Sequence, residues 1–249
     1  AITFTIQKGK YMIGLGTAIN IGLIIAGSLC GLAFGRFMKE NLKQTLMMVS
    51  GIIVLLLGMS GAMQYMLVIV NGTLQTTGPM LMIISMVAGA IIGELIDLNR
   101  WITVFGDWVK AKTGNTGDPQ FTHAFITASL TFTVGAMGVL GSIQDGLTGN
   151  YQTLLLKGIL DGIIVMVMVS SMGKGALFSF IPVGITQWII TAMAHIAAPL
   201  MTPSAIDNLS YVGSILIFCV GIDLIWPGKI RIANLLPAIF VAMGLTFLL

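Results

Sequence analysis

Long apolar stretches separated by short polar connections make up most of the chain. About eight of these stretches approach the roughly 20 residues that a helix needs to cross a bilayer. We expect spans at residues 12–37, 46–70, 80–96, 121–140, 151–171, 176–198, 209–226 and 232–249. The pattern predicts an all-α, polytopic integral membrane protein in which residues 12–249 form a single transmembrane domain.

Residues 1–11 do not continue this pattern. We interpret them as an N-terminal extension or a remnant of cloning, with Met12 as the natural start. A signal peptide is the alternative, because Lys8 and Lys10 precede an apolar run. That run continues to about Phe37, however, and is too long for the apolar segment of a cleaved signal peptide.

Composition narrows the class of protein further. Only 8% of the residues are charged and the mean hydropathy is +0.99, whereas soluble domains carry about 25% charged residues. A water-soluble domain is therefore excluded, and the bilayer is the expected partner. The net charge of +3 is too small to indicate a nucleic-acid partner. Cys30 and Cys219 stand alone within apolar runs, so the sequence predicts neither a metal site nor a cofactor.

The basic residues lie on one side of the predicted topology. With eight spans and an outside N-terminus, the inside connections contain Arg36, Lys39, Lys43, Arg100, Lys110, Lys112, Lys174, Lys229 and Arg231. Only Lys8 and Lys10 oppose this asymmetry. Because basic residues favour the cytoplasmic side, both termini are expected outside. Residues 100–112 predict an amphipathic helix in the membrane surface, with Trp101 and Trp108 on its apolar face.

Glycines recur every four residues in the first span, at Gly27, Gly31 and Gly35. Such a row lies on one helix face and lets another helix approach closely. Packing within the chain is the favoured interpretation, and a homo-oligomer formed through glycine-lined helices is the alternative.

A faint internal repeat is also present. A shift of 163 residues aligns residues 16–60 with residues 179–223 without gaps and matches Gly58 with Gly221. Spans one to three then correspond to spans six to eight in inverted orientation, around a central hairpin of spans four and five. Inverted repeats are a recurring plan of secondary transporters.

Two charged residues, Lys157 and Asp161, fall inside the span at residues 151–171, four residues apart on one helix face. Counted from Tyr151, Lys157 lies about 9 Å and Asp161 about 15 Å deep. Charges at such depth are costly and mark ion or substrate pathways. The structural alternative is a neutralising pair that only fixes helix packing, and a misplaced span would leave Lys157 at the surface.

The end of the fourth span carries Gly135, Gly138 and Gly141. We expect these glycines to break the helix and to free backbone groups for an ion or a polar solute. Gln144 and Asp145 follow in the segment SIQDG and are expected at the outer mouth of the site. An ordinary outside turn is the alternative.

Two amides, Asn20 and Gln187, also fall near the midplane, about 12 and 16 Å from the entries of their spans. Pro182 precedes Gln187 and favours a kink there. A buried amide alone more often bridges helices than binds a ligand. Because four spans contribute polar groups at one depth, however, the sequence predicts a single polar site.

The other ionisable residues indicate no chemistry. Glu94, Asp97 and Asp223 are expected as caps at the inner interface, and His123 and His195 near opposite membrane faces. The sequence contains no nucleotide-binding loop, metal-binding HExxH motif or nucleophile elbow. An enzyme is therefore not expected.

Several segments carry a family resemblance: GLGTAIN, VGAMGVLGSIQDGLTG, LLLKGILDG, FSFIP and IANLLPA. They resemble the YqgA/YdfK-like bacterial inner-membrane proteins, a domain-of-unknown-function family (number 554). The resemblance covers essentially residues 12–249. It implies a polytopic protein of the bacterial inner membrane and implies no activity.

We expect a secondary transporter of a small solute, coupled to protons or sodium ions, with Asp161 binding the coupling ion. Lys157 would neutralise Asp161 or meet an anionic substrate group. An oligomeric channel is one alternative, and a non-transporting scaffold or sensor subunit is another.

Overall fold

The computed structural model describes residues 12–134, 136–197, 199 and 202–247. The interpretation of residues 1–11 and the prediction for Gly135 concern residues outside these ranges. The helices are α1 (Leu15–Gly35), α2 (Glu40–Met66), α3 (Pro79–Ile96), α4 (Leu98–Lys112), α5 (Phe121–Thr133), α6 (Ala136–Thr148), α7 (Gln152–Met172), α8 (Phe180–Ala192), α9 (Ala194–Ala197), α10 (Pro203–Ile225) and α11 (Pro237–Leu245). Shorter elements are the strands β1 (Leu67–Val70) and β2 (Thr73–Thr76) and the 3-10 helices η1 (Lys174–Ser179) and η3 (Ile232–Leu235).

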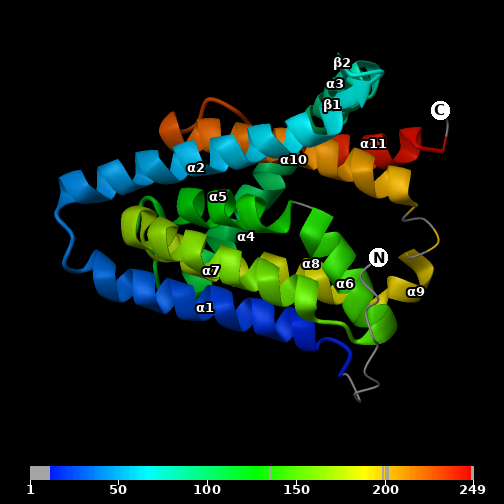
Figure 1. Ribbon diagram of the computed structural model, residues 1–249. Coiled ribbons are helices and arrows are strands. Elements are labelled where there is room, and N and C mark those ends of the chain that lie inside the picture. Colours follow the sequence, from blue (N-terminus) through cyan, green and yellow to red (C-terminus); the bar gives the residue numbers. More distant parts are fainter. Residues whose placement is uncertain (1–11, 135, 198, 200–201, 248–249) are drawn as a thin grey trace.

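Two long helix pairs frame the molecule (Figure 1). Helix α1 packs along α7 on one side, and α2 packs along α10 on the other. Helices α5, α6 and α8 lie between the two pairs. The polar positions of α7 therefore face a region that both pairs enclose.

Glycines explain why each pair can pack so closely. A Cβ atom at Gly27 would collide with the carbonyl of Gly162, and one at Gly31 with the carbonyl of Met166. In the second pair, Gly58 lies against the backbone of Phe218. Packing within the chain, the interpretation favoured from the sequence, is the role that the structure gives these glycines.

The exterior along the helices is apolar. Leu56, Ile163 and Phe240 are 50%, 55% and 73% exposed, and many other large aliphatic side chains are exposed to a similar degree. Apolar surface on this scale is not tolerated by a soluble monomer, but it suits contact with lipid. On α4, Trp101 and Trp108 are exposed while Gly106 and Val109 are buried. This arrangement fits the predicted amphipathic helix.

In the part of the chain that the structure describes, the candidate membrane spans are fewer than the eight that the sequence predicts. Within the described residues, six helices are long and apolar enough to cross a membrane, with η1 and α8 counted as one. Helices α5 and α6 form a further candidate that bends by 61° at the break between them. The expected last span, residues 232–249, contains η3 and the short helix α11. A total of eight spans stays a prediction.

One span boundary was wrong. We expected a helix to residue 70, but α2 ends at Met66 and the chain continues into a β-hairpin. Asn71 and Gly72, which connect the strands, both have positive φ angles, of 51° and 77°. An Asn-Gly pair adopts this two-residue turn readily, so the turn forms the hairpin even though Leu67–Val70 is apolar.

Candidate functional site

The candidate site is centred on an ion pair between Lys157 and Asp161 on α7. Both residues are buried, at 7% and 6% exposed. Their spacing of four residues places them one above the other on the same face of the helix. The two opposite charges compensate one another in this buried setting, where a single unpaired charge would be very costly.

Three other predicted residues come together with this pair. Gly138 of α6 lies beside Lys157, since a Cβ atom there would be 3.3 Å from Lys157 Cε and 3.9 Å from Gln187 Nε2. Asn20 of α1 packs on Gly158 of α7, where a Cβ atom would lie 3.0 Å from the Asn20 Cα atom. Three helices, α1, α7 and α8, thus bring polar side chains to one place, and α6 contributes Gly138.

The two amides of this cluster are buried without a hydrogen bond of standard geometry. Asn20 is fully buried and Gln187 is 3% exposed. The Asn20 amide faces Asp161. Nevertheless, among the described residues neither Asn20 nor Gln187 makes a side-chain hydrogen bond of standard geometry. Since buried amides are normally satisfied, two orphaned amides next to an ion pair indicate a site that a polar ligand or water can complete.

A cavity of about 330 Å³ reaches this pair from the side of α2 and α10. We call it the central cavity, and its polar lining is Gln64, Tyr65, Thr131, Lys157, Asp161, Ser210 and Ser214. It extends to the C-terminal end of α2, where Gln64 is exposed. The ion pair is therefore buried in protein but lies on the wall of a space large enough for a small solute.

Sequence reasoning missed five of these lining residues: Gln64, Tyr65, Thr131, Ser210 and Ser214. The hydroxyls of Thr131 and Ser214 donate to carbonyls one turn earlier in their own helices, at 2.7 Å in both cases. Hydroxyls satisfied in this way are common in membrane helices, so they gave no signal in the sequence. Gln64 and Tyr65 together offered the available signal, as adjacent polar residues within an apolar span.

Asp145 and Gln144 do not form an outer mouth, and their interpretation as an exposed turn was wrong. Both lie within α6, and Asp145 is fully buried. The Asp145 carboxylate accepts hydrogen bonds from the backbone N–H groups of Gly14, Gly16 and Thr17, at 3.2, 3.0 and 3.4 Å. Those amides begin α1 and have no partner within the helix, so Asp145 caps α1 from another helix.

Gln144 and Gly141 on the same helix also pack against residues of α7. Gln144 accepts a hydrogen bond from Thr153 Oγ1 at 2.7 Å. Gly141 packs against Leu154, whose Cδ2 atom would lie 2.8 Å from an added Cβ.

Gly138 and Gly141 are helical, and the break in the span comes before them, at Val134. The expected break is present, but these two glycines do not form it.

The acidic residues expected as caps have local partners. Asp97 accepts from the Arg100 N–H at 3.4 Å, and Glu94 pairs with Arg231 at 3.1 Å. Asp223 accepts from the Gly228 N–H at 2.8 Å. Among the described residues, no three His, Cys, Asp or Glu side chains are grouped as metal ligands.

Comparison with known proteins identifies the family but gives no activity. The family model described as "Protein of unknown function (DUF554)" matches residues 15–247. The uncharacterized membrane protein YdfK of Bacillus subtilis is 27% identical over 235 residues, which are 94% of this chain and 96% of that protein. The uncharacterized protein YqgA of Escherichia coli is 24% identical over 240 residues, 93% of this chain and 96% of that protein. No solved structure matches the chain.

These findings confirm the resemblance inferred from the sequence. The family model covers nearly the whole chain, and one relative is itself described as a membrane protein. The apolar exterior and the candidate spans agree with that description. The chain is therefore a membrane protein that belongs to the DUF554 family.

Proposed function

We propose that the chain is a secondary transporter of a small polar solute, coupled to a proton or a sodium ion at Asp161. The observation that carries this proposal is the buried Lys157–Asp161 pair on the wall of the central cavity, next to the unpartnered amides of Asn20 and Gln187. A pair that only fixed packing would be sealed by its neighbours. This pair instead borders a space with further polar groups.

The chemistry of the cluster suits coupled binding. A cation at Asp161 would compete with Lys157 for the same carboxylate, so its binding would release the ammonium group. The released Lys157 could then meet an anionic group of the solute, while Asn20 and Gln187 offer both donors and acceptors. Binding of the ion and of the solute would in this way depend on one another.

The packing of α2 against α10 has the antiparallel orientation that an inverted repeat requires of these two spans. Gly58 contacts Phe218, and the contact of Gly221 with Leu55 is its counterpart after the shift of 163 residues. Likewise the contact of Gly61 with Ser214 corresponds to that of Gly51 with Leu224. In all four contacts a later position on α2 meets an earlier position on α10, so the two helices run antiparallel.

We further propose that the chain lies in the bacterial inner membrane with both termini outside. One cavity brings together Arg36 at the end of α1, Lys43 at the start of α2 and Lys174 at the start of η1. We call this end of the molecule the basic end. Clustering of basic residues from two connections, α1–α2 and α7–η1, at one end is what the positive-inside rule requires of the cytoplasmic side.

The test is uptake of solutes into proteoliposomes with and without an imposed ion gradient. Solutes are first selected by their thermal stabilisation of the purified protein. Asp161→Asn is expected to abolish gradient-driven uptake, because the neutral amide cannot hold the coupling cation. Asp207→Asn is the matched control, because it makes the same chemical change outside the site. Asp207 is exposed near the start of α10.

Two outcomes would overturn the proposal. Unchanged gradient-driven uptake by the Asp161→Asn variant would remove Asp161 from the mechanism. Conduction that is independent of a gradient and does not saturate would favour the channel alternative, which none of the contacts described above supports.

A further inference from the structure

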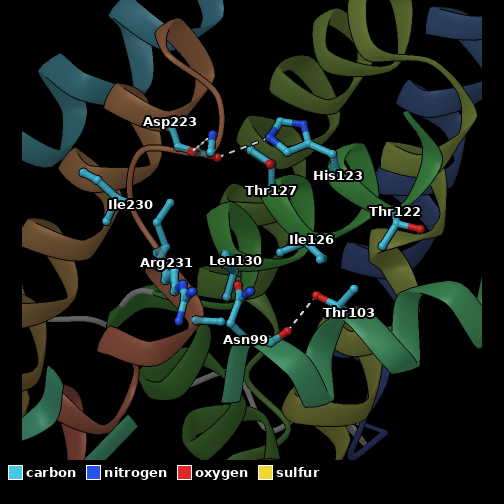
Figure 2. Close-up of a pocket in the computed structure, with 13 residues that line it drawn as sticks. Asn99, Thr103, Thr122, His123, Ile126, Thr127, Leu130, Asp223, Ile230 and Arg231 are labelled. Atoms are coloured by element: carbon cyan, nitrogen blue, oxygen red, sulfur yellow. Dashed lines mark hydrogen bonds and ion pairs between the residues drawn. The ribbon is translucent and has the colours of Figure 1, made fainter. Parts of the chain in front are cut away.

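A second cavity, of about 380 Å³, lies at the basic end of the molecule and holds a histidine next to a carboxylate. His123 Nε2 lies 3.3 Å from Asp223 Oδ2. Figure 2 shows the two side chains pointing toward each other from α5 and from the end of α10, with Thr127 close to them. His123 is partly open to the outside, with 39% of its side chain exposed, whereas the Asp223 side chain is 9% exposed.

The geometry of Asp223 leaves one oxygen for the cavity. Its Oδ1 atom accepts a hydrogen bond of 2.8 Å from the Gly228 N–H, which stabilises the turn after α10. Its Oδ2 atom is directed at His123. A purely structural cap would need only the first of these interactions. The interaction with His123 places a carboxylate and an imidazole together on the wall of a cavity that can hold several water molecules.

The other charges around this cavity are already engaged. Arg231 lines it and pairs with Glu94 of α3, at 3.1 Å. Asp107 of α4 accepts a hydrogen bond of 2.6 Å from Thr122, which lies next to His123 in the sequence. Because Arg231 and Glu94 offset one another, the charge that a small ion meets inside the cavity is set mainly by Asp223.

Only one helical turn separates this cavity from the central cavity. Thr127 lines the cavity at the basic end, and Thr131 of the same helix lines the central cavity. The rise between them is about 6 Å. Thr131 Oγ1 donates to the Thr127 carbonyl at 2.7 Å, so the two residues follow one face of α5. The central cavity extends toward the opposite end of the molecule, so the two cavities approach one another from opposite sides.

We propose that the cavity at the basic end is the entrance through which water and small cations reach Lys157 and Asp161, and that Asp223, which His123 holds in place, selects for cations there. This inference rests on the proposed function for the role of the central pair. The thin layer between Thr127 and Thr131 is then the barrier that closes this entrance when the central cavity is open to the other side.

The test measures the reaction of single cysteines with membrane-impermeant methanethiosulfonate reagents added from the basic end. Cys30 and Cys219 are first replaced by serine, and Thr127→Cys, Thr131→Cys and Ala128→Cys are introduced one at a time. Thr127→Cys is expected to react, and Thr131→Cys to react more slowly because the barrier must open first. Ala128→Cys should not react, because Ala128 packs in the apolar core and lines neither cavity. Lack of reaction at both threonine positions would overturn the inference.

Charge selection needs a second comparison, between the cationic trimethylammonium reagent and the anionic sulfonate reagent. Asp223→Asn is expected to lower the ratio of cationic to anionic reaction rates at Thr131→Cys by about tenfold, because charged entrances concentrate ions of opposite sign. If Asp223 only stabilised the turn, both reagents would change equally, and charge selection would be refuted.

These labelling results are independent of solute uptake. Reaction at Thr131→Cys together with normal uptake by Asp161→Asn would refute the proposed role of Asp161 and leave the entrance standing. Loss of uptake by Asp161→Asn without any reaction at Thr127→Cys or Thr131→Cys would refute the entrance alone.

Discussion

Asp145 and Asp161 are buried carboxylates on consecutive helices, yet their surroundings differ completely. Asp145 accepts three backbone hydrogen bonds from the start of α1 and is fully buried. Asp161 has one ionic partner, Lys157, and lies on the wall of a cavity beside unpartnered amides. A saturated carboxylate has no capacity left for a ligand, so it serves the fold. An incompletely satisfied one is suited to binding.

The largest effect on stability is expected from Asp145→Ala. The change removes the acceptor of three buried N–H groups at the start of α1, and it should lower the free energy of unfolding by about 3 kcal/mol. Thermal denaturation of the detergent-purified protein would measure this loss. Asp145→Asn keeps one acceptor oxygen and should lie between the wild type and Asp145→Ala. A variant Asp145→Ala that keeps its melting temperature but loses uptake would place Asp145 with Asp161 and break the comparison.

The sequence predicted the surroundings of Asp161 correctly and those of Asp145 incorrectly, for a physical reason. Lys157 and Asp161 are four residues apart on a helix, so local geometry alone brings them together. The partners of Asp145 are about 130 positions away in the sequence, and no local pattern predicts that contact. The segment SIQDG also has the composition of a turn, which led to the wrong interpretation.

The rest of the fold also contains features that the sequence predicted and features that it did not. Hydropathy found the long helices but could not distinguish the apolar strand Leu67–Val70 from the end of a helix. The Asn71–Gly72 turn was the available signal. The central cavity was not predictable, because its walls come from five helices and its Ser and Thr residues are typical of close helix packing.

An intermediate effect is expected from separating Lys157 and Asp161. Asp161→Asn leaves the ammonium group of Lys157 without its partner and should cost about 2 kcal/mol, less than the 3–5 kcal/mol typical of a sealed pair, because the cavity can admit water. Adding Lys157→Met should restore stability to within about 1 kcal/mol of the wild type. Thermal denaturation of both single variants and of the double variant gives the coupling energy.

Uptake measured on the same three variants separates stability from function. All three are expected to lack gradient-driven uptake, including the double variant that regains its stability. If the double variant transported normally, the ion pair would have only a packing role, and the contrast with Asp145 would disappear.

The smallest effect on stability is expected from removing the unpartnered amides. Asn20→Leu and Gln187→Met delete buried amides that make no hydrogen bond of standard geometry, so each should leave the free energy of unfolding unchanged or raise it by up to about 1 kcal/mol. The matched control is Asn234→Leu, because Asn234 is equally buried but accepts a hydrogen bond of 2.6 Å from the Asn99 N–H. That control should lose about 1–2 kcal/mol of the free energy of unfolding.

Uptake by Asn20→Leu and Gln187→Met should nevertheless fall by about tenfold, the equivalent of one lost hydrogen bond to the transported solute. A fall in melting temperature as large as that of Asn234→Leu would mean that the two amides hold the helices together, and the cluster around Asp161 would then be structural like Asp145.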